Sequence, residues 1–112
     1  MQLFQLSDLQ SQRSRGNRPY MEFLRVPAMS AGIYVLPAAA TDNQKPHAED
    51  EIYYVLSGRA RMLLRDASGK QQDLAIAPGD IIFVPARQEH RFHSITEELS
   101  LLVFFAPAES AD

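Results

Sequence analysis

The 112-residue sequence contains no cysteine. This absence excludes disulfide bonds, thiolate zinc sites and cysteine nucleophiles. Long hydrophobic runs are also missing, because no apolar stretch approaches the roughly 20 residues that cross a bilayer as a helix. The first residues lack the basic start and apolar stretch of a signal peptide. Together these absences predict a cytoplasmic protein that does not interact with a membrane.

Excess charge of one sign is absent as well. The net charge is −3, which does not favour a nucleic-acid-binding surface. The hydrophobic fraction of 46% and the charged fraction of 22% are ordinary for a globular protein. A chain of this length can bury one core without additional cross-links. We therefore expect one domain and no nucleic-acid partner.

The first 19 residues differ in pattern from the rest. Leu3, Leu6 and Leu9 recur at helical spacing, which predicts a short amphipathic helix over residues 3–12. The polar segment from Ser11 to Pro19 predicts a loop. Residues 1–19 are thus expected to form an N-terminal helix and loop ahead of the main domain.

After Pro19, strand-like runs follow one another, separated by glycine, proline or polar clusters. The expected strands span residues 20–26, 32–36, 51–57, 59–65, 71–76, 81–84, 89–95 and 99–105. Residues 66–70 have the composition of a hairpin turn. Parallel sheets need crossover helices, for which the sequence leaves no room. The pattern predicts an all-β sandwich or barrel over residues 20–107, followed by a tail at 108–112.

Two short windows carry the residues best suited to chemistry. They place six residues at fixed offsets: His47, Glu51 and Gly58 in the first, and Gly79, Pro85 and His90 in the second. These windows resemble the paired signature motifs of the cupin superfamily, and the chain looks most like its small, single-domain bacterial members. The resemblance implies a jelly-roll-like barrel, the double-stranded β-helix, here with a short N-terminal helix.

The resemblance also implies a metal site formed by His47, Glu51 and His90. Donors from different strands can converge inside a barrel, where apolar walls shield them. Imidazole and carboxylate together suit divalent iron, manganese, nickel or zinc. Two imidazoles and one carboxylate are the donor set of non-haem iron(II) oxygenases, so Fe²⁺ is the favoured ion and Mn²⁺, Ni²⁺ or Zn²⁺ are alternatives.

The sequence departs from the family motifs at several positions. Lys45 stands where the family has its first histidine, and a protonated lysine has no lone pair to donate. Gln44 is a possible fourth ligand through its carboxamide oxygen. Arg87 occupies a glycine position in the turn before His90, and Ser94 replaces a frequent asparagine.

Strand alternation predicts which side chains accompany the ligands. An inward Glu51 places Tyr53, Val55 and Ser57 on the same face. An inward His90 brings Phe92 inward and turns His93 outward, so His93 is excluded from the metal site. The expected pocket walls are four aromatic residues and one flexible one: Tyr34, Tyr53, Phe83, Phe92 and Met62.

Simpler interpretations remain open at each of these positions. His47 and His90 taken alone are also compatible with surface positions. Glu49 competes with Glu51 for the ligand role, although the spacing to Gly58 favours Glu51. Three arginines, at positions 25, 59 and 61, meet an anionic substrate only if one points inward, and are otherwise surface charges.

Two functions are compatible with the sequence. The first is a metal-dependent enzyme, dioxygenase-like, acting on a small organic molecule. The second is a non-catalytic binding or sensory module, which the loss of a ligand at Lys45 favours. The apolar residues around Tyr54 and Phe104 also predict a homodimer, because these strands have two apolar faces that need cover.

Overall fold

The computed structural model describes residues 1–110. It consists of one helix followed by six strands: α1 (Leu6–Gly16), β1 (Tyr20–Val26), β2 (Met29–Leu36), β3 (Asp50–Arg65), β4 (Gln71–Ile76), β5 (Ile81–Val84) and β6 (Glu89–Ala106). The sheet order is β1-β2-β6-β3-β4, and β5 pairs with the first part of β3. All paired strands run antiparallel, as the sequence predicts for an all-β fold.

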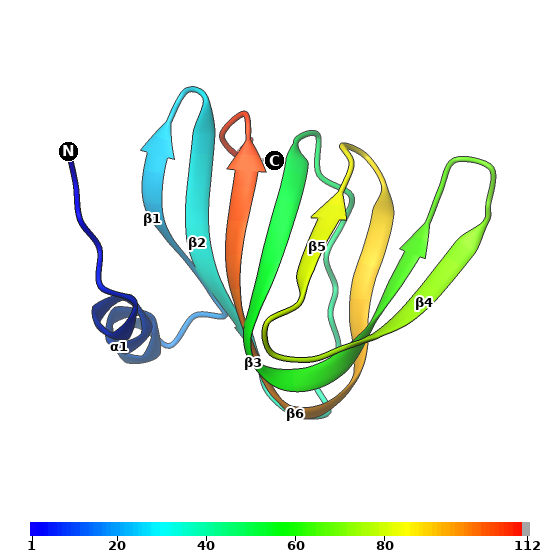
Figure 1. Cartoon of the computed structure of the whole chain (residues 1–112), viewed down its shortest axis with the longest axis horizontal. Coiled ribbons are helices and arrows are strands. Elements are labelled where there is room, and N and C mark those ends of the chain that lie inside the picture. Colours follow the sequence, from blue (N-terminus) through cyan, green and yellow to red (C-terminus); the bar gives the residue numbers. More distant parts are fainter. Residues whose placement is uncertain (111–112) are drawn as a thin grey trace.

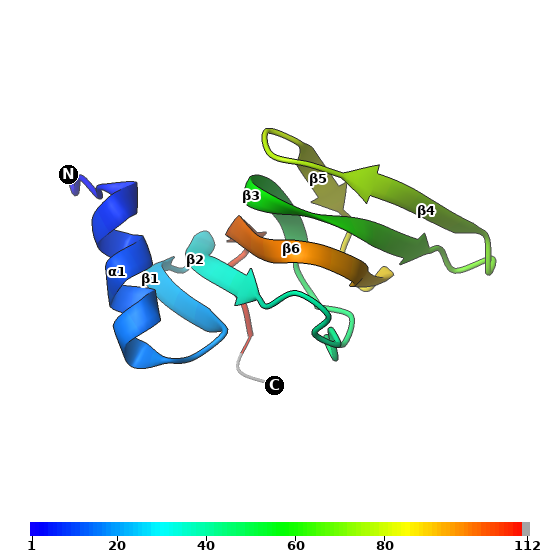
Figure 2. The ribbon, with the colours of Figure 1, turned by 90° about the horizontal axis from the view of Figure 1, so that it is seen from below.

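The sheet is strongly curved, and its two long strands set its shape (Figure 1). β6 and β3 pair along most of their lengths and bend together through the lower part of the molecule. The β3–β4 hairpin projects to one side, and α1 lies at the opposite end beside β1 (Figure 2). The long loop from residue 37 to residue 49 returns from the end of β2 to the start of β3.

The helix is displaced from the predicted range of residues 3–12. It begins after Gln5, whose carbonyl accepts the amides of Asp8 and Leu9, and it ends at Asn17 in a left-handed cap. Leu9 is the buried residue of this helix, and the residues after it are polar. Because helices are predicted from apolar periodicity, the sequence contains no sign that the helix continues to Gly16. Within residues 1–110, no helix is long and apolar enough to span a membrane.

Four of the predicted strands merge into two. Residues 51–57 and 59–65 belong to β3, and residues 89–95 and 99–105 belong to β6. The pairing register of β3 with β6 shifts on both sides of Ser57, and Gly58 adopts φ +95°. This irregularity is a β-bulge, which bends a strand without ending it.

The bulge also corrects the predicted position of Ser57. Before it, Glu51, Tyr53 and Val55 are buried, as alternation predicts. Ser57 is exposed, and after the bulge the even-numbered residues are the buried ones. The extra residue therefore moves the inward face of β3 by one position.

The main core lies on the concave side of β3 and β6. Its largest fully buried apolar side chains include Tyr53, Met62, Phe92, Leu99 and Leu101. A second, smaller cluster joins Leu9 of α1 to Ile33 and Val35 of β2. The helix thus packs on the convex side near β2, away from the concave surface on which the polar site lies.

We predict that Gly58→Ala is severely destabilising. An added Cβ would overlap the Glu98 carbonyl oxygen and come within 2.7 Å of Leu99 Cα. Gly69→Ala is the matched control, because Gly69 also has positive φ but has no atom within 4 Å of an added Cβ. Urea denaturation should show a loss of roughly 1–2 kcal/mol for the control, the ordinary left-handed cost, and a larger loss at Gly58. Equal losses would contradict the steric explanation.

Candidate metal centre

Three predicted ligands from three chain segments meet at one point. His47 belongs to the loop before β3, Glu51 lies on β3, and His90 lies near the start of β6. One potential ligand atom from each lies within 4.8 Å of the other two. The centroids of the two imidazole rings are 5.7 Å apart.

Glu51 is the most unusual member of this group. Its relative exposure is 2%, and neither carboxylate oxygen has a hydrogen-bond partner. His90 Nε2 lies 3.3 Å from Oε1, but not in hydrogen-bonding geometry. A buried carboxylate without partners is costly, so its surroundings favour a bound cation. The site therefore fits a divalent metal by its chemistry as well as by its donor types.

His90 is oriented by a backbone carbonyl. Its Nδ1 lies 2.9 Å from the oxygen of Gln88, a contact in which Nδ1–H donates and leaves the Nε2 lone pair free. Nε2 faces Glu51 and lies 3.2 Å from the Tyr53 hydroxyl. In the metal-free protein, burial lowers the pKa of His90, but Glu51 and the Gln88 carbonyl together outweigh it, so the net pKa is raised.

His47 has polar neighbours at both ring nitrogens. Nε2 lies 3.3 Å from Gln44 Oε1, and Nδ1 lies 3.4 Å from Glu109 Oε2. The ring also packs edge-on against Phe105, with centroids 4.9 Å apart. His47 is therefore held between the loop that carries it and the segment that follows β6.

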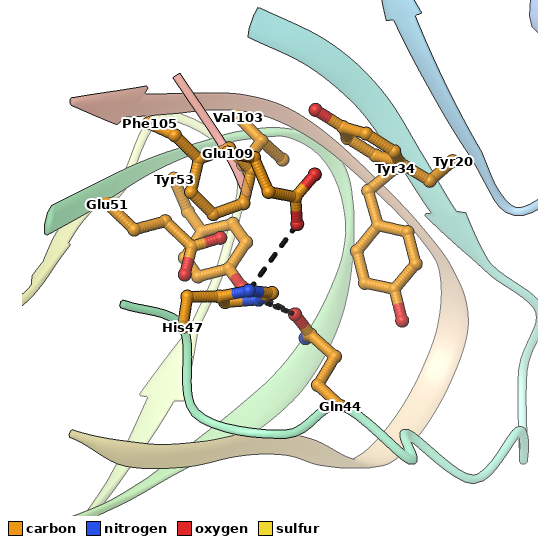
Figure 3. A pocket seen from close by; sticks show the side chains of 9 residues that line it. All are labelled: Tyr20, Tyr34, Gln44, His47, Glu51, Tyr53, Val103, Phe105 and Glu109. Carbon is orange, nitrogen blue, oxygen red and sulfur yellow. Dashed lines mark hydrogen bonds and ion pairs between the residues drawn. The ribbon is translucent and has the colours of Figure 1, made fainter. Parts of the chain in front are cut away.

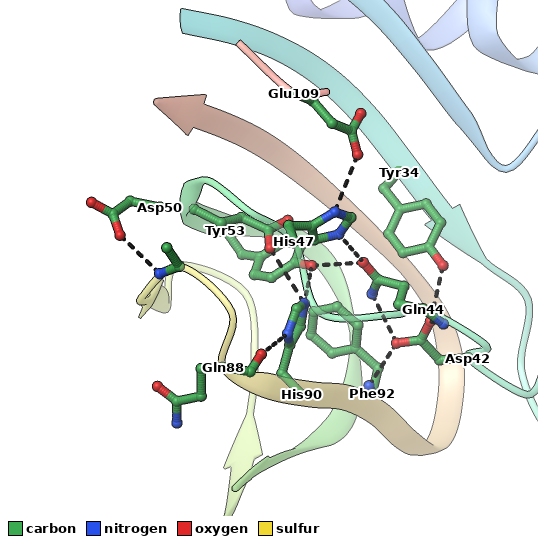
Figure 4. A network of polar contacts seen from close by, with 12 residues as sticks. Tyr34, Asp42, Gln44, His47, Asp50, Tyr53, Gln88, His90, Phe92 and Glu109 are labelled. Carbon is green, nitrogen blue, oxygen red and sulfur yellow. Dashed lines mark hydrogen bonds and ion pairs between the residues drawn. The ribbon is translucent and has the colours of Figure 1, made fainter. Parts of the chain in front are cut away.

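Gln44 is turned toward the ligands by Asp42 (Figure 4). Buried Asp42 accepts hydrogen bonds from both the backbone and the side-chain nitrogens of Gln44. With its nitrogen engaged, the amide directs Oε1 toward the Tyr53 hydroxyl, which donates to it over 3.0 Å. Asp42 also accepts from Tyr34 and from the backbone of Phe92, so the same carboxylate joins the loop to β2 and β6.

The motif departures have visible structural consequences. Lys45 is exposed and borders the groove outside the cavity together with His47. Arg87, at the position of a family glycine, adopts φ 65°, which for a residue with a Cβ is strained. Its amide donates to the His47 carbonyl over 2.6 Å, so this turn connects the two motif windows. Ser94 likewise adopts a positive φ of 51°.

A cavity of about 190 Å³ opens beside the ligands (Figure 3). At roughly 30 Å³ per water molecule in the liquid, this is space for about six waters or a small organic molecule. Its walls combine tyrosines, apolar side chains and carboxylates: Tyr20, Tyr34, Gln44, His47, Glu51, Tyr53, Val103, Phe105 and Glu109. The Tyr20 hydroxyl is buried without a hydrogen-bond partner.

The predicted pocket walls divide into three groups. Tyr34 and Tyr53 line the cavity. Phe92 and Met62 are buried in the core, where the Phe92 ring packs edge-on against Tyr53 with centroids 5.0 Å apart. Phe83 is 57% exposed, because β5 turns it to the outer face opposite Ile52, so its assignment as a pocket wall is wrong.

His93, which the sequence excludes from the metal site, and Glu49, the rival of Glu51, both lie outside the ligand group. His93 faces the surface, where Nε2 lies 2.9 Å from Asp73 Oδ1, and that contact and Arg61 lower the pKa of Asp73. Glu49 is buried, with Oε1 unpartnered, but it is not among the three clustered residues.

Four cavity residues were missed by the sequence analysis: Tyr20, Val103, Phe105 and Glu109. For Val103 and Phe105 a signal existed, since strand alternation places them on one face of the last strand. Tyr20 and Glu109 carried no comparable signal. Burial raises the pKa of Glu109, and the carboxylates of Glu51 and Glu49 raise it further.

Comparison with known proteins identifies the family. Residues 32–106, two-thirds of the chain, match the cupin domain. The chain belongs to the cupin family. The cupin barrel with an N-terminal helix, predicted from the two motif windows, is confirmed.

Among curated proteins, an uncharacterized protein of Streptomyces coelicolor is 43% identical over 110 residues, covering 98% of this chain and all of that protein. Acireductone dioxygenase of Microcystis aeruginosa is 43% identical over 47 residues, which cover 42% of this chain and 26% of the enzyme. A structure of Bacillus subtilis oxalate decarboxylase, a protein with Mn(II) centres, superimposes with a TM-score of 0.68 at 17% identity. That match covers 79% of this chain and 27% of the decarboxylase, and it concerns the fold alone.

Proposed function

We propose that this cupin is a metal-dependent enzyme that acts on a small organic molecule. It binds one divalent metal ion through His47, Glu51 and His90. The unpartnered, buried carboxylate of Glu51 between two imidazoles is the observation that carries the proposal. Fe²⁺ is favoured, because two imidazoles and one carboxylate form the donor set of non-haem iron oxygenases. The cytoplasmic location expected from the sequence remains a prediction.

The arrangement supports dioxygenase-like chemistry. When bound, the metal ion supplies Lewis acidity and open positions at which small molecules are held in fixed orientation. Gln44 Oε1 lies beside His47 and is the candidate for a fourth protein donor. Val103 and Phe105 form an apolar wall that excludes water from the reacting groups.

The cavity walls offer hydrogen bonds to a substrate. The Tyr20 hydroxyl is free of partners, and the Tyr53 hydroxyl lies within 3.2 Å of His90 Nε2. Burial and nearby carboxylates raise the pKa values of Tyr20 and Tyr53, so both phenols stay protonated at neutral pH. A small molecule that bears hydroxyl or carbonyl groups therefore matches the cavity in size and in polarity.

A non-catalytic binding or sensory role is the second candidate. Lys45 favours it, since the family's first motif histidine is replaced by an exposed residue whose protonated side chain has no lone pair to donate. The same three side chains would then hold a metal that serves only to bind a ligand in the cavity.

We predict that the three ligand variants His47→Ala, Glu51→Gln and His90→Ala lose metal. Each removes one of only three donors, so we expect Fe²⁺ content after anaerobic reconstitution to fall roughly tenfold or more. His93→Ala, which removes a surface histidine, should bind metal as the wild type does. Elemental analysis of protein purified without chelators measures the metal content of the ligand variants and of the His93→Ala control. Full metal content in the ligand variants would refute the assigned site.

We predict oxygen consumption by the Fe²⁺-loaded protein with at least one small diol or thiol. An oxygen electrode with anaerobically reconstituted protein tests a panel of such compounds, with the Glu51→Gln variant as the inactive control. If calorimetry detects metal-dependent binding of a compound but no product forms, the result would instead support the sensory role. Uptake that persists in the Glu51→Gln variant would exclude this site as its source.

We further propose that the chain forms a homodimer through the outer face of β3 and β5. Ile52 and Tyr54 on β3 pair with Phe83 and Ile81 on β5, and all four side chains are exposed. Such a contiguous apolar patch on a sheet is typical of an interaction surface. A second copy of the chain supplies the same apolar surface in a self-complementary contact.

Sedimentation at micromolar concentration should show dimers for the wild type and monomers for Phe83→Asp. Leu74→Asp is the control, because Leu74 is 50% exposed but lies on β4, opposite inward-facing Met62. Leu74 pairs with the second half of β3, whereas the patch lies on the first half of β3 and on β5. The control should therefore remain dimeric. A monomeric wild type would rule out this interface.

A further inference from the structure

We propose that Glu109, beyond the last strand, is a positioning residue that fixes the orientation and the tautomer of His47 for metal binding. The inference rests on the proposed metal site and adds to it a residue outside the matched cupin domain, which ends at residue 106. Among the three ligand candidates, His47 is the one with which Glu109 forms an ion-pair contact.

The contact geometry defines the role of each ring nitrogen. Glu109 Oε2 lies 3.4 Å from Nδ1, whereas Nε2 lies 3.3 Å from Gln44 Oε1, which can only accept a hydrogen bond (Figure 3). The two acceptors compete for the single proton of a neutral ring, and a charged carboxylate attracts it more strongly than a neutral amide oxygen does. Glu109 therefore favours the proton on Nδ1 against Gln44, which is the tautomer in which Nε2 is free to donate to a metal.

In both ligand histidines, an oxygen atom beside Nδ1 orients the ring, but the two oxygen atoms come from different parts of the chain. His90 Nδ1 is held by the Gln88 carbonyl, in the turn immediately before β6. His47 lies in the long loop before β3 and has no backbone carbonyl at Nδ1; the carboxylate of Glu109 occupies that position (Figure 4). Without it, Gln44 Oε1 would remain as the acceptor beside the ring and would favour the proton on Nε2, where it blocks metal binding.

The segment that carries Glu109 is anchored on both sides of its side chain. The Glu109 amide donates to Ser30 Oγ over 2.9 Å, and its carbonyl accepts from Arg25 Nη2 over 2.7 Å. The preceding amide, of Ala108, donates to the Pro27 carbonyl. These contacts fix the segment to the β1–β2 hairpin, so the carboxylate reaches His47 from a defined backbone position.

The contact is also partly protected from solvent. The side chains of His47 and Glu109 are only 21% and 25% exposed, respectively. Glu109 lines both the cavity and a wider groove outside it, which Lys45 and Arg25 border. At this boundary, the carboxylate is shielded enough to orient the ring more strongly than a fully exposed pair would.

The test measures Mn²⁺ affinity by calorimetry for the full chain and three variants. Glu109→Ala should weaken binding by roughly 10–100-fold, the range found when the outer partner of a ligand histidine is lost. Glu109→Gln keeps an acceptor oxygen and should show an intermediate loss. Glu22→Gln is the matched control, since Glu22 borders the same outer groove and pairs with Arg25 but does not contact His47. Its affinity should equal that of the wild type.

A second readout is independent of metal. In the metal-free protein, ¹⁵N chemical shifts of the neutral His47 ring should indicate the Nδ1–H tautomer, and Glu109→Ala should shift it toward the Nε2–H tautomer that Gln44 favours. Thermal unfolding of each metal-free variant establishes that the fold is retained.

The outcomes separate this inference from the proposed function. If the wild type binds no Mn²⁺, the metal site and the role of Glu109 both fail. If the wild type binds Mn²⁺ and Glu109→Ala binds it equally well, the role of Glu109 alone is overturned. If Glu22→Gln weakens binding as much as Glu109→Ala, general charge at the groove explains the effect, and positioning is refuted.

Discussion

A carboxyl group buried without a hydrogen-bond partner is the constraint around which this structure is arranged. Glu51 lies inside the curved sheet, neither of its side-chain oxygens is hydrogen-bonded, and the imidazoles of His47 and His90 lie close to it. An isolated buried carboxylate is normally neutralised, paired or bound to a cation. The imidazoles of His47 and His90 lie beside it, and this donor set suits a divalent ion. A bound metal ion would therefore stabilise a group that is otherwise unfavourable in this position.

The supporting contacts explain how separate segments keep this group together. Asp42 joins the long loop to β2 and β6, and the amide of strained Arg87 connects the turn before β6 to the His47 carbonyl. For His90, the orienting carbonyl comes from Gln88, only two residues earlier in the chain. For His47 on the loop, the neighbour at Nδ1 is Glu109, which is far away in the sequence.

Much of the fold and the core of the site follow from local sequence pattern. Strand boundaries such as 20–26 and 71–76 were predictable because alternation and turn residues act over short ranges. The grouping of His47, Glu51 and His90 followed from the family motifs. Phe83 and Ser57 were misplaced because the face that a strand buries depends on its pairing and its bulges. Glu109 had no local signal, since only the folded chain brings it to His47.

The bulge at Gly58 has a consequence for how the protein can vary. The alternation of β3 changes at the bulge. Odd-numbered residues point inward in the half that carries Glu51, and even-numbered residues point inward in the half that pairs with β4. The distal β3–β4 arm, which projects from the body in Figure 1, is not independent of the site, because Leu64 of β3 pairs with His90 of β6. The tip of the arm, residues 66–70, lies beyond this pairing. Loops of different length can therefore be placed at the tip while the alternation of β3 and the position of Glu51 are kept.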